Sequence, residues 1–112
     1  MLGLELEISV LEVSRRLKAG ETVRLIDVRE PHEFERCRIE GAELVPMRSI
    51  PQALGKLTEK AQEGSLVFYC HHGPRSLQVV SWLRRNGLAC CQSMQGGIDR
   101  WSASVDPGVG RY

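Results

Sequence analysis

The stretch LVFYCHHGPRS, residues 66–76, joins a strand-like run to a helix-like segment and decides how the rest of the chain is interpreted. Its first four residues are apolar β-formers, and the run ends on Cys70. A turn with Gly73 and Pro74 follows, and residues 77–87 have the apolar spacing and the terminal glycine of a helix. The stretch therefore predicts that Cys70 lies at the carboxyl end of a strand, facing the start of a helix.

Strand-like and helix-like segments also follow one another on both sides of this stretch. Strands are predicted at residues 5–8, 23–27, 42–45, 66–69 and 88–94. Helical segments are predicted between Ser9 and Gly20, at 31–35, in two pieces on either side of Gly55 within 49–61, at 77–87 and at 98–101. Strands that alternate with helices predict one α/β domain with a mainly parallel five-stranded sheet and right-handed crossovers.

The turn after Cys70 has the features of a site for a sulfur anion. A helix N-terminus and the free amides of a tight turn both stabilise a thiolate. Gly73 tolerates the positive φ that such a turn needs, and Pro74 suits the first turn of the helix. These features predict that Cys70 is a nucleophile. The alternative is that Cys70 is a small apolar residue packed at a strand end.

Two further polar residues are predicted to lie at the same edge of the sheet. Asp27 ends the second predicted strand, and the carboxyl ends of parallel strands share one edge. Asp27 either bonds the amides of the next turn or belongs to the site. Arg29 either pairs with Asp27 or Glu33 as scaffold, or attracts anions. Arg75 likewise either binds an anionic substrate or braces the loop against a carboxylate.

Two adjacent histidines lie inside the loop. His71 and His72 are predicted to give their amides to the anion site and to line its mouth, where partial protonation near pH 6.5 would favour anions. Adjacent histidines in a loop are expected to diverge, and the cysteines lack the spacing of zinc knuckles. No metal site is therefore predicted.

Four short motifs, taken together, match one known family. In chain order they are LIDVREPHEF at residues 25–34, IEGA at 39–42 followed by Pro46, CHHGPRS at 70–76 and GGIDRW at 96–101. On these motifs the chain resembles the rhodanese domains, whose fold is a three-layer α/β domain with helices on both sides of a central sheet. The chain departs from the family's usual Gly-His pair, because Cys37 and Arg38 stand there. We expect this change to affect local geometry only.

The resemblance implies a sulfurtransferase. Cys70 would attack the outer sulfur of a small anionic donor such as thiosulfate, become a persulfide, and pass that sulfur to cyanide, a thiol or a protein. No cofactor beyond this covalent intermediate is implied. The implied anion-binding loop consists of His71, His72, Gly73, Pro74, Arg75 and Ser76, with Asp27 and Arg29 in support.

Two other functions fit parts of the pattern. Phosphatases and arsenate reductases use cysteine–arginine loops of related shape, but those loops have one more residue between the two, and the smaller loop here suits a sulfur atom better. A docking module that uses the fold without turnover is the second alternative. The presence of both Cys70 and Arg75 argues against it.

Length and composition limit the remaining possibilities. The 112 residues suit a single domain, 1–112, with residues 104–112 as a surface tail. With 15 basic and 14 acidic side chains, binding to nucleic acid or to a membrane is not predicted. The first residues carry acids where a secretory signal needs bases, so a cytoplasmic location is expected. The sequence does not specify the oligomeric state.

Three cysteines lie outside the loop. In a reducing compartment they are not expected to form disulfides. Cys37 is either an inert thiol or a second sulfur carrier. Cys90 and Cys91 are adjacent, so on a strand they would face opposite sides of the sheet.

Overall fold

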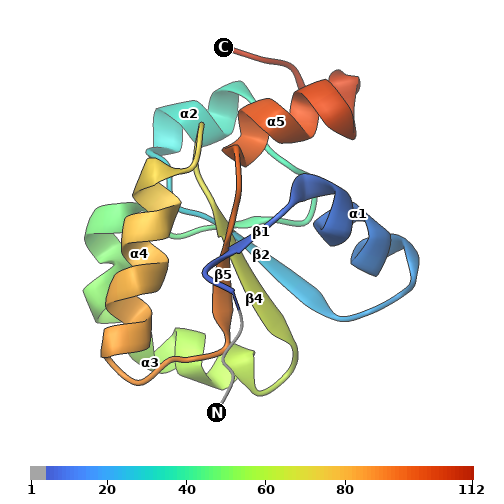
Figure 1. Ribbon diagram of the computed structural model, residues 1–112. Coiled ribbons are helices and arrows are strands. Elements are labelled where there is room, and N and C mark those ends of the chain that lie inside the picture. Colours follow the sequence, from blue (N-terminus) through green and yellow to red (C-terminus); the bar gives the residue numbers. More distant parts are fainter. Residues whose placement is uncertain (1–4) are drawn as a thin grey trace.

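The computed structural model describes residues 5–112 and contains one five-stranded sheet with the order β1-β5-β4-β2-β3 (Figure 1). Every strand pair in it is parallel, which confirms the predicted α/β architecture. The strands are β1 (Glu7–Ile8), β2 (Val23–Asp27), β3 (Glu43–Leu44), β4 (Ser65–Tyr69) and β5 (Cys91–Met94). The predicted domain also includes residues 1–4, which lie outside the described residues.

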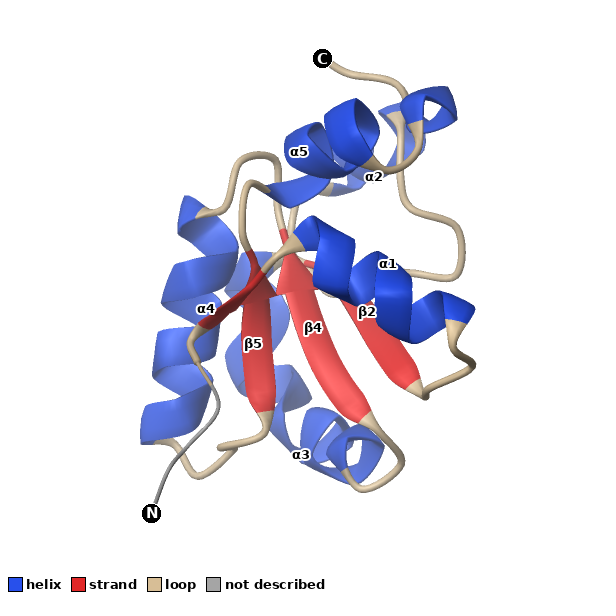
Figure 2. Cartoon of the chain, turned by 45° about the vertical axis from the view of Figure 1, so that its right-hand side comes forward, coloured by secondary structure: helices blue, strands red, loops and turns tan. Residues whose placement is uncertain are grey.

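Helices cover both faces of the sheet, as Figure 2 shows. They are α1 (Val10–Lys18), α2 (Pro31–Arg36), α3 (Ile50–Ala61), α4 (Pro74–Arg85) and α5 (Gly97–Ser104), with short 3₁₀ turns at Met47–Ser49 and Pro107–Val109. The first core packs α3 and α4 on one face, and the second packs α1 and α5 on the other. The helices and the sheet thus form the three layers of the predicted fold.

Strand β4 contributes side chains to both hydrophobic cores. Leu66 and Phe68 point into the α3/α4 core, while Val67 and Tyr69 point into the α1/α5 core. Side chains alternate between the two faces of a strand, so a strand buried on both sides has an unbroken apolar sequence. This is why residues 66–69 carry such a strong apolar signal. Cys70 follows Tyr69 directly, at the carboxyl end of β4, which is labelled in Figure 1.

Several predicted boundaries need correction. Gly55 does not divide the segment 49–61, because α3 runs through it as one helix. A glycine inside a helix costs only about 1 kcal/mol, and burial of Ile50 and Leu57 on the inner face of α3 offsets that cost. The fifth strand begins at Cys91 rather than 88, because the Leu88 N–H bonds to the Leu83 carbonyl and ends α4.

The remaining corrections concern the ends of elements. The first strand covers Glu7–Ile8 rather than residues 5–8, and the third covers Glu43–Leu44 rather than 42–45. The last helix is longer than predicted, since α5 covers Gly97–Ser104 and buries Trp101. Edge strands and terminal helices have few neighbours to extend them, so their ends follow tertiary packing more than local sequence.

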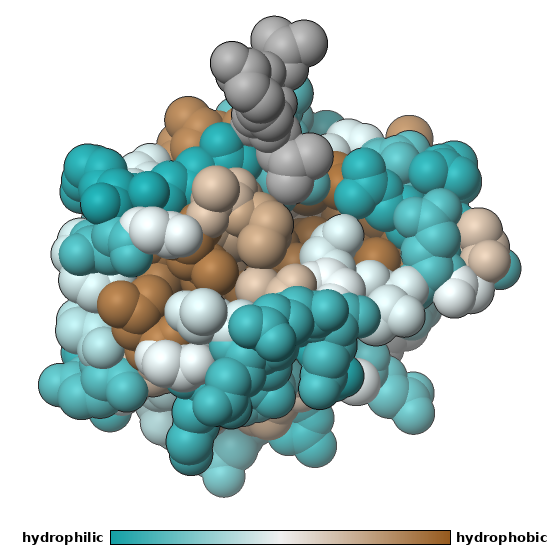
Figure 3. All heavy atoms as spheres, turned by 90° about the horizontal axis from the view of Figure 1, so that it is seen from below, coloured by the Kyte–Doolittle hydropathy of each residue, from teal (hydrophilic) through white to brown (hydrophobic). Residues whose placement is uncertain are grey.

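The surface seen from below Figure 1 carries both polar and apolar side chains. Figure 3 shows hydrophilic side chains around apolar ones on this face. Among the described residues, no helix combines the length and the apolarity needed to cross a bilayer.

Candidate active site

Cys70 lies directly after β4, with its side chain fully buried beneath the loop. Its Sγ accepts hydrogen bonds from the N–H groups of Gly73, at 3.1 Å, and Ser76, at 3.4 Å. Gly73 is the N-cap of α4 and has a φ of +121°, which turns its amide back toward the sulfur. The sulfur therefore faces the positive end of α4, where an anion is stabilised.

A hydroxyl pair extends the surroundings of the sulfur. Ser76 Oγ lies 3.5 Å from Cys70 Sγ and 3.1 Å from the Gly73 carbonyl oxygen. It also lies 2.8 Å from Oγ of Ser93, and both serines are fully buried. Ser93 was not among the predicted site residues. A polar residue in the middle of a short buried strand is the signal that would have identified it.

The first turn of α5 holds the loop from the other side. The amides of Ile98 and Asp99 donate to the carbonyl oxygens of Cys70 and His71 at 2.9 and 3.0 Å. Gly97 makes this approach possible, because a Cβ there would lie 2.4 Å from each of those oxygens. The double-glycine turn therefore brings the backbone of α5 against the loop.

Arg75 braces the loop against α2. Its two terminal nitrogens donate to the two carboxylate oxygens of Glu33 at 2.7 and 3.0 Å. The same carboxylate accepts the Glu30 amide in a capping box. The Arg75 guanidinium is the main reason that the pKa of Glu33 lies well below its ordinary value. Of the two roles open to Arg75, the structure shows the brace. Glu33 was predicted only as a possible partner of Arg29 and not as part of the site.

Asp27 and Arg29 form a buried ion pair beneath the same edge. Both side chains are fully buried, and the guanidinium donates to both Asp27 oxygens, with the shortest contact at 2.7 Å. Asp27 Oδ1 also accepts the Arg29 amide at 2.9 Å, so the carboxylate orders the turn as well. Arg29 Nη2 donates to the Cys37 carbonyl at 2.5 Å. Cys37 and Arg38 replace the family's usual pair at this point in the chain. The bond from Arg29 goes to the backbone carbonyl of residue 37, so it does not depend on the side chain there.

Tyr112 connects these two ion pairs. Its hydroxyl donates to Glu33 Oε2 at 2.7 Å and accepts from Arg29 Nη1 at 2.8 Å. Its ring stacks on the His71 ring, with centroids 3.9 Å apart and an angle of 5°. Burial, followed by the Glu33 carboxylate, raises the pKa of Tyr112 to about 12. The predicted surface tail 104–112 is therefore anchored at its end beside the loop.

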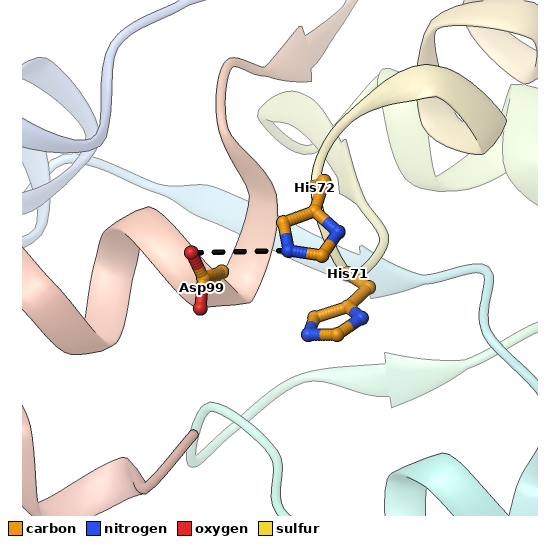
Figure 4. Close-up of side chains that lie close together, drawn as sticks. All are labelled: His71, His72 and Asp99. Carbon is orange, nitrogen blue, oxygen red and sulfur yellow. Dashed lines mark ion pairs between the residues drawn. The ribbon is translucent and has the colours of Figure 1, made fainter. Parts of the chain in front are cut away.

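The two loop histidines do not diverge. Their ring centroids lie 3.8 Å apart, and both rings lie beside Asp99 from α5 (Figure 4). Burial and the neighbouring His72 lower the pKa of His71 from its ordinary 6.5, so less of its imidazole is protonated near pH 6.5 than in a free histidine.

The other cysteines lie in different surroundings. Cys37 is half-buried, Cys90 is exposed and Cys91 is buried, and none of the four described cysteines forms a disulfide. Burial raises the pKa of Cys91 to about 11, and its thiol donates to the Leu88 carbonyl at 3.3 Å. Cys91 is therefore a packing residue.

Comparisons with known proteins agree with this geometry. A family model described as a rhodanese-like domain matches residues 9–104. A sulfurtransferase of Allochromatium vinosum is 33% identical over 96 residues, which cover 86% of this chain and 87% of that protein. The human single-domain sulfurtransferase TSTD1 superposes with a TM-score of 0.77 at 26% identity, covering 90% of this chain and 98% of that one.

A longer relative contains the same unit. The probable adenylyltransferase/sulfurtransferase MoeZ of Mycobacterium tuberculosis is 33% identical over 96 residues, or 86% of this chain. The chain spans only 24% of that protein's length. Together with the loop geometry and the five-stranded parallel sheet, these matches show that the chain belongs to the rhodanese-like domain family.

Proposed function

We propose that this protein is a sulfurtransferase that carries sulfur as a persulfide on Cys70, with thiosulfate as a donor. The observation that supports this proposal is the convergence of two backbone N–H groups and one hydroxyl on Cys70 Sγ at the start of α4. Hydrogen-bond donors that are fixed in place around a sulfur stabilise its anionic form before any substrate arrives. Such a site suits both a thiolate and a terminal persulfide anion.

The reaction takes place in two transfers. The Cys70 thiolate attacks the outer sulfur of thiosulfate, a new S–S bond forms, and the old S–S bond breaks so that sulfite leaves with its electron pair. A thiophilic acceptor such as cyanide, a thiol or a protein then takes the terminal sulfur and returns Cys70 to the thiolate. Because the covalent intermediate carries the sulfur, the cycle needs no resident cofactor.

The surrounding residues hold the loop in place during this cycle. Arg75 forms an ion pair with Glu33, and the buried Asp27–Arg29 pair supports the turn that follows β2. In this proposal Arg75 and Arg29 keep the loop amides aimed at the sulfur. The four free cysteines suit a reducing compartment, and we infer a cytoplasmic location on that ground.

Mass spectrometry of the intact protein tests the proposal. After incubation with thiosulfate, the wild type should gain one sulfur atom, and cyanide should remove it. Cys70→Ser should gain none, whereas Cys90→Ser, which removes an exposed thiol, should still gain one. An unmodified wild type in the absence of reductant would overturn the proposal, and hydrolysis of an aryl phosphate by the same sample would favour a phosphatase instead.

A further inference from the structure

Three potential metal ligands converge at the edge of the loop. They are His71 and His72 from the loop and Asp99 from the first turn of α5, and one ligand atom from each lies within 4.8 Å of the others. His72 Nε2 lies 3.9 Å from Asp99 Oδ2. Figure 4 shows both imidazoles with a ring nitrogen on the side of Asp99. Two imidazoles and one carboxylate are a common ligand set for zinc and related ions.

The backbone fixes the spacing of these residues. The Asp99 amide donates to the His71 carbonyl at 3.0 Å, so the two ligand-bearing elements are hydrogen-bonded to each other. Gly97 allows that approach, since any side chain there would collide with the same carbonyl. A site built on such contacts loses little conformational entropy when an ion binds.

The surroundings of the two imidazoles suit them to bind a cation. His71 Nε2 is buried and has no hydrogen-bond partner among the described residues, which is unusual for a buried polar atom. The His72 side chain is 61% exposed, which gives an ion access from solvent.

We propose that His71, His72 and Asp99 bind a divalent transition-metal ion, for which Zn²⁺ is the probe, with water completing its coordination. Bonds of about 2.0–2.2 Å to nitrogen and oxygen bring two ligand atoms of one ion to roughly 3–4 Å from each other. His72 Nε2 and Asp99 Oδ2 are already in this range at 3.9 Å, and because all three ligand atoms lie within 4.8 Å of one another, small side-chain rotations close the site. Two of the three ligands belong to the loop that follows β4, but Cys70 itself is not one of them.

Arg111 competes with the ion for Asp99. Its Nε and Nη2 donate to the two carboxylate oxygens at 2.9 and 3.0 Å. The Arg111 side chain is 58% exposed, and an exposed pair of this kind contributes little to stability. A divalent cation held by two imidazoles should displace it. Arg111→Ala should therefore tighten Zn²⁺ binding, by a factor of about 3 or more, because it frees both oxygens.

Calorimetric titration with Zn²⁺ at pH 7 tests the site without any activity assay. The background variant Cys37→Ser/Cys90→Ser removes the accessible thiols outside the loop. In it we expect one ion per chain, with binding at least tenfold weaker in His72→Ala and in Asp99→Asn. Two variants serve as matched controls, because His32 and Asp106 are exposed and lie outside the cluster. His32→Ala and Asp106→Asn should bind as the background does.

Absorption spectroscopy with Co²⁺ identifies the ligand type. Nitrogen and oxygen ligands should give no sulfur-to-cobalt charge-transfer band, in the background variant and in the same variant carrying Cys70→Ser. A band that disappears with Cys70→Ser would assign the ion to the thiolate and overturn the proposal. Unchanged Zn²⁺ binding in His72→Ala and Asp99→Asn would overturn it as well. Circular dichroism establishes that each variant is folded. Failure of either test leaves the sulfur chemistry of the proposed function untouched.

Discussion

At the scale of single residues, the surroundings of Cys70 depend on where one hydroxyl proton points. Ser76 has one such proton and two acceptors in reach, the Gly73 carbonyl at 3.1 Å and Cys70 Sγ at 3.5 Å. Ser93 can donate its own proton to Ser76 Oγ at 2.8 Å, which leaves the Ser76 proton for one of those acceptors. When the sulfur is anionic, it is the stronger acceptor. Ser93 is thus a positioning residue for Ser76.

Removal of either hydroxyl should slow the chemistry of Cys70. For Ser76→Ala we expect a loss of about tenfold in the alkylation rate of Cys70 by iodoacetamide at pH 7, the low end for a hydrogen bond to a charged group. Ser93→Ala should lose less, because its effect passes through Ser76. The control is Ser102→Ala, which removes another buried serine hydroxyl away from the sulfur. Equal rates in all three variants would contradict this account.

The Glu33–Arg75 brace should contribute measurably to stability. Glu33→Gln removes the charge that faces Arg75 and disturbs the bond from Tyr112, so we expect a loss of about 2 kcal/mol in the free energy of unfolding. Urea denaturation at pH 7 measures it. Arg48→Gln breaks the exposed Arg48–Glu30 pair and should cost under about 1 kcal/mol. A larger loss for Arg48→Gln than for Glu33→Gln would refute the ranking.

At the scale of elements, the start of α5 and the Cys70 loop form one unit. Two backbone hydrogen bonds join them, and they require the absence of a side chain at residue 97. Gly97 also has a φ of +61°, where a side chain adds strain of its own. Helix α5 therefore positions the loop through its backbone.

Two glycine substitutions should have opposite effects. Gly97→Ala should destabilise the fold by about 1–3 kcal/mol and slow Cys70 alkylation, because the loop must move away from the new Cβ. Gly55→Ala should stabilise by about 0.5–1 kcal/mol, because nothing lies within 4 Å of a Cβ there and α3 is continuous. Thermal and urea unfolding check both. A neutral Gly97→Ala would show that the loop does not depend on this approach.

At the scale of the whole molecule, the sheet brings together residues that are far apart in the sequence. The Cys70 loop could be predicted because strand, turn and helix signals are contiguous there. The sequence could mark Ser93 only as a polar residue in a buried strand and could not pair Glu33 with Arg75, since the partners of Ser93 and Glu33 are 17 and 42 positions away. The stacking of Tyr112 on His71 also depends on tertiary packing. Local patterns predict an element, whereas only the folded chain shows which polar groups meet.

The polar network around Glu33 should make stability depend on pH on the acid side. The folded state holds the pKa of Glu33 below its ordinary 4.5, so the unfolded state binds a proton more readily as pH falls. A lowered pKa in the folded state contributes stability that is complete above the unfolded value. That stability is lost as pH falls through the folded value.

The difference in unfolding free energy between the wild type and Glu33→Gln isolates this contribution. We expect a difference of about 2 kcal/mol at pH 7 that begins to shrink below pH 5 and continues to shrink toward pH 3, because the glutamine side chain of the variant does not titrate. Glu12, whose pKa is lowered to about 2 mainly by its bond with Arg15, is present in both proteins, so its effect cancels. Urea titrations at pH 7, 5, 4 and 3 measure the trend. Parallel stability curves would mean that the Glu33 carboxylate is not held by Arg75 and Tyr112 in solution, and the brace that orders the loop would have to be sought elsewhere.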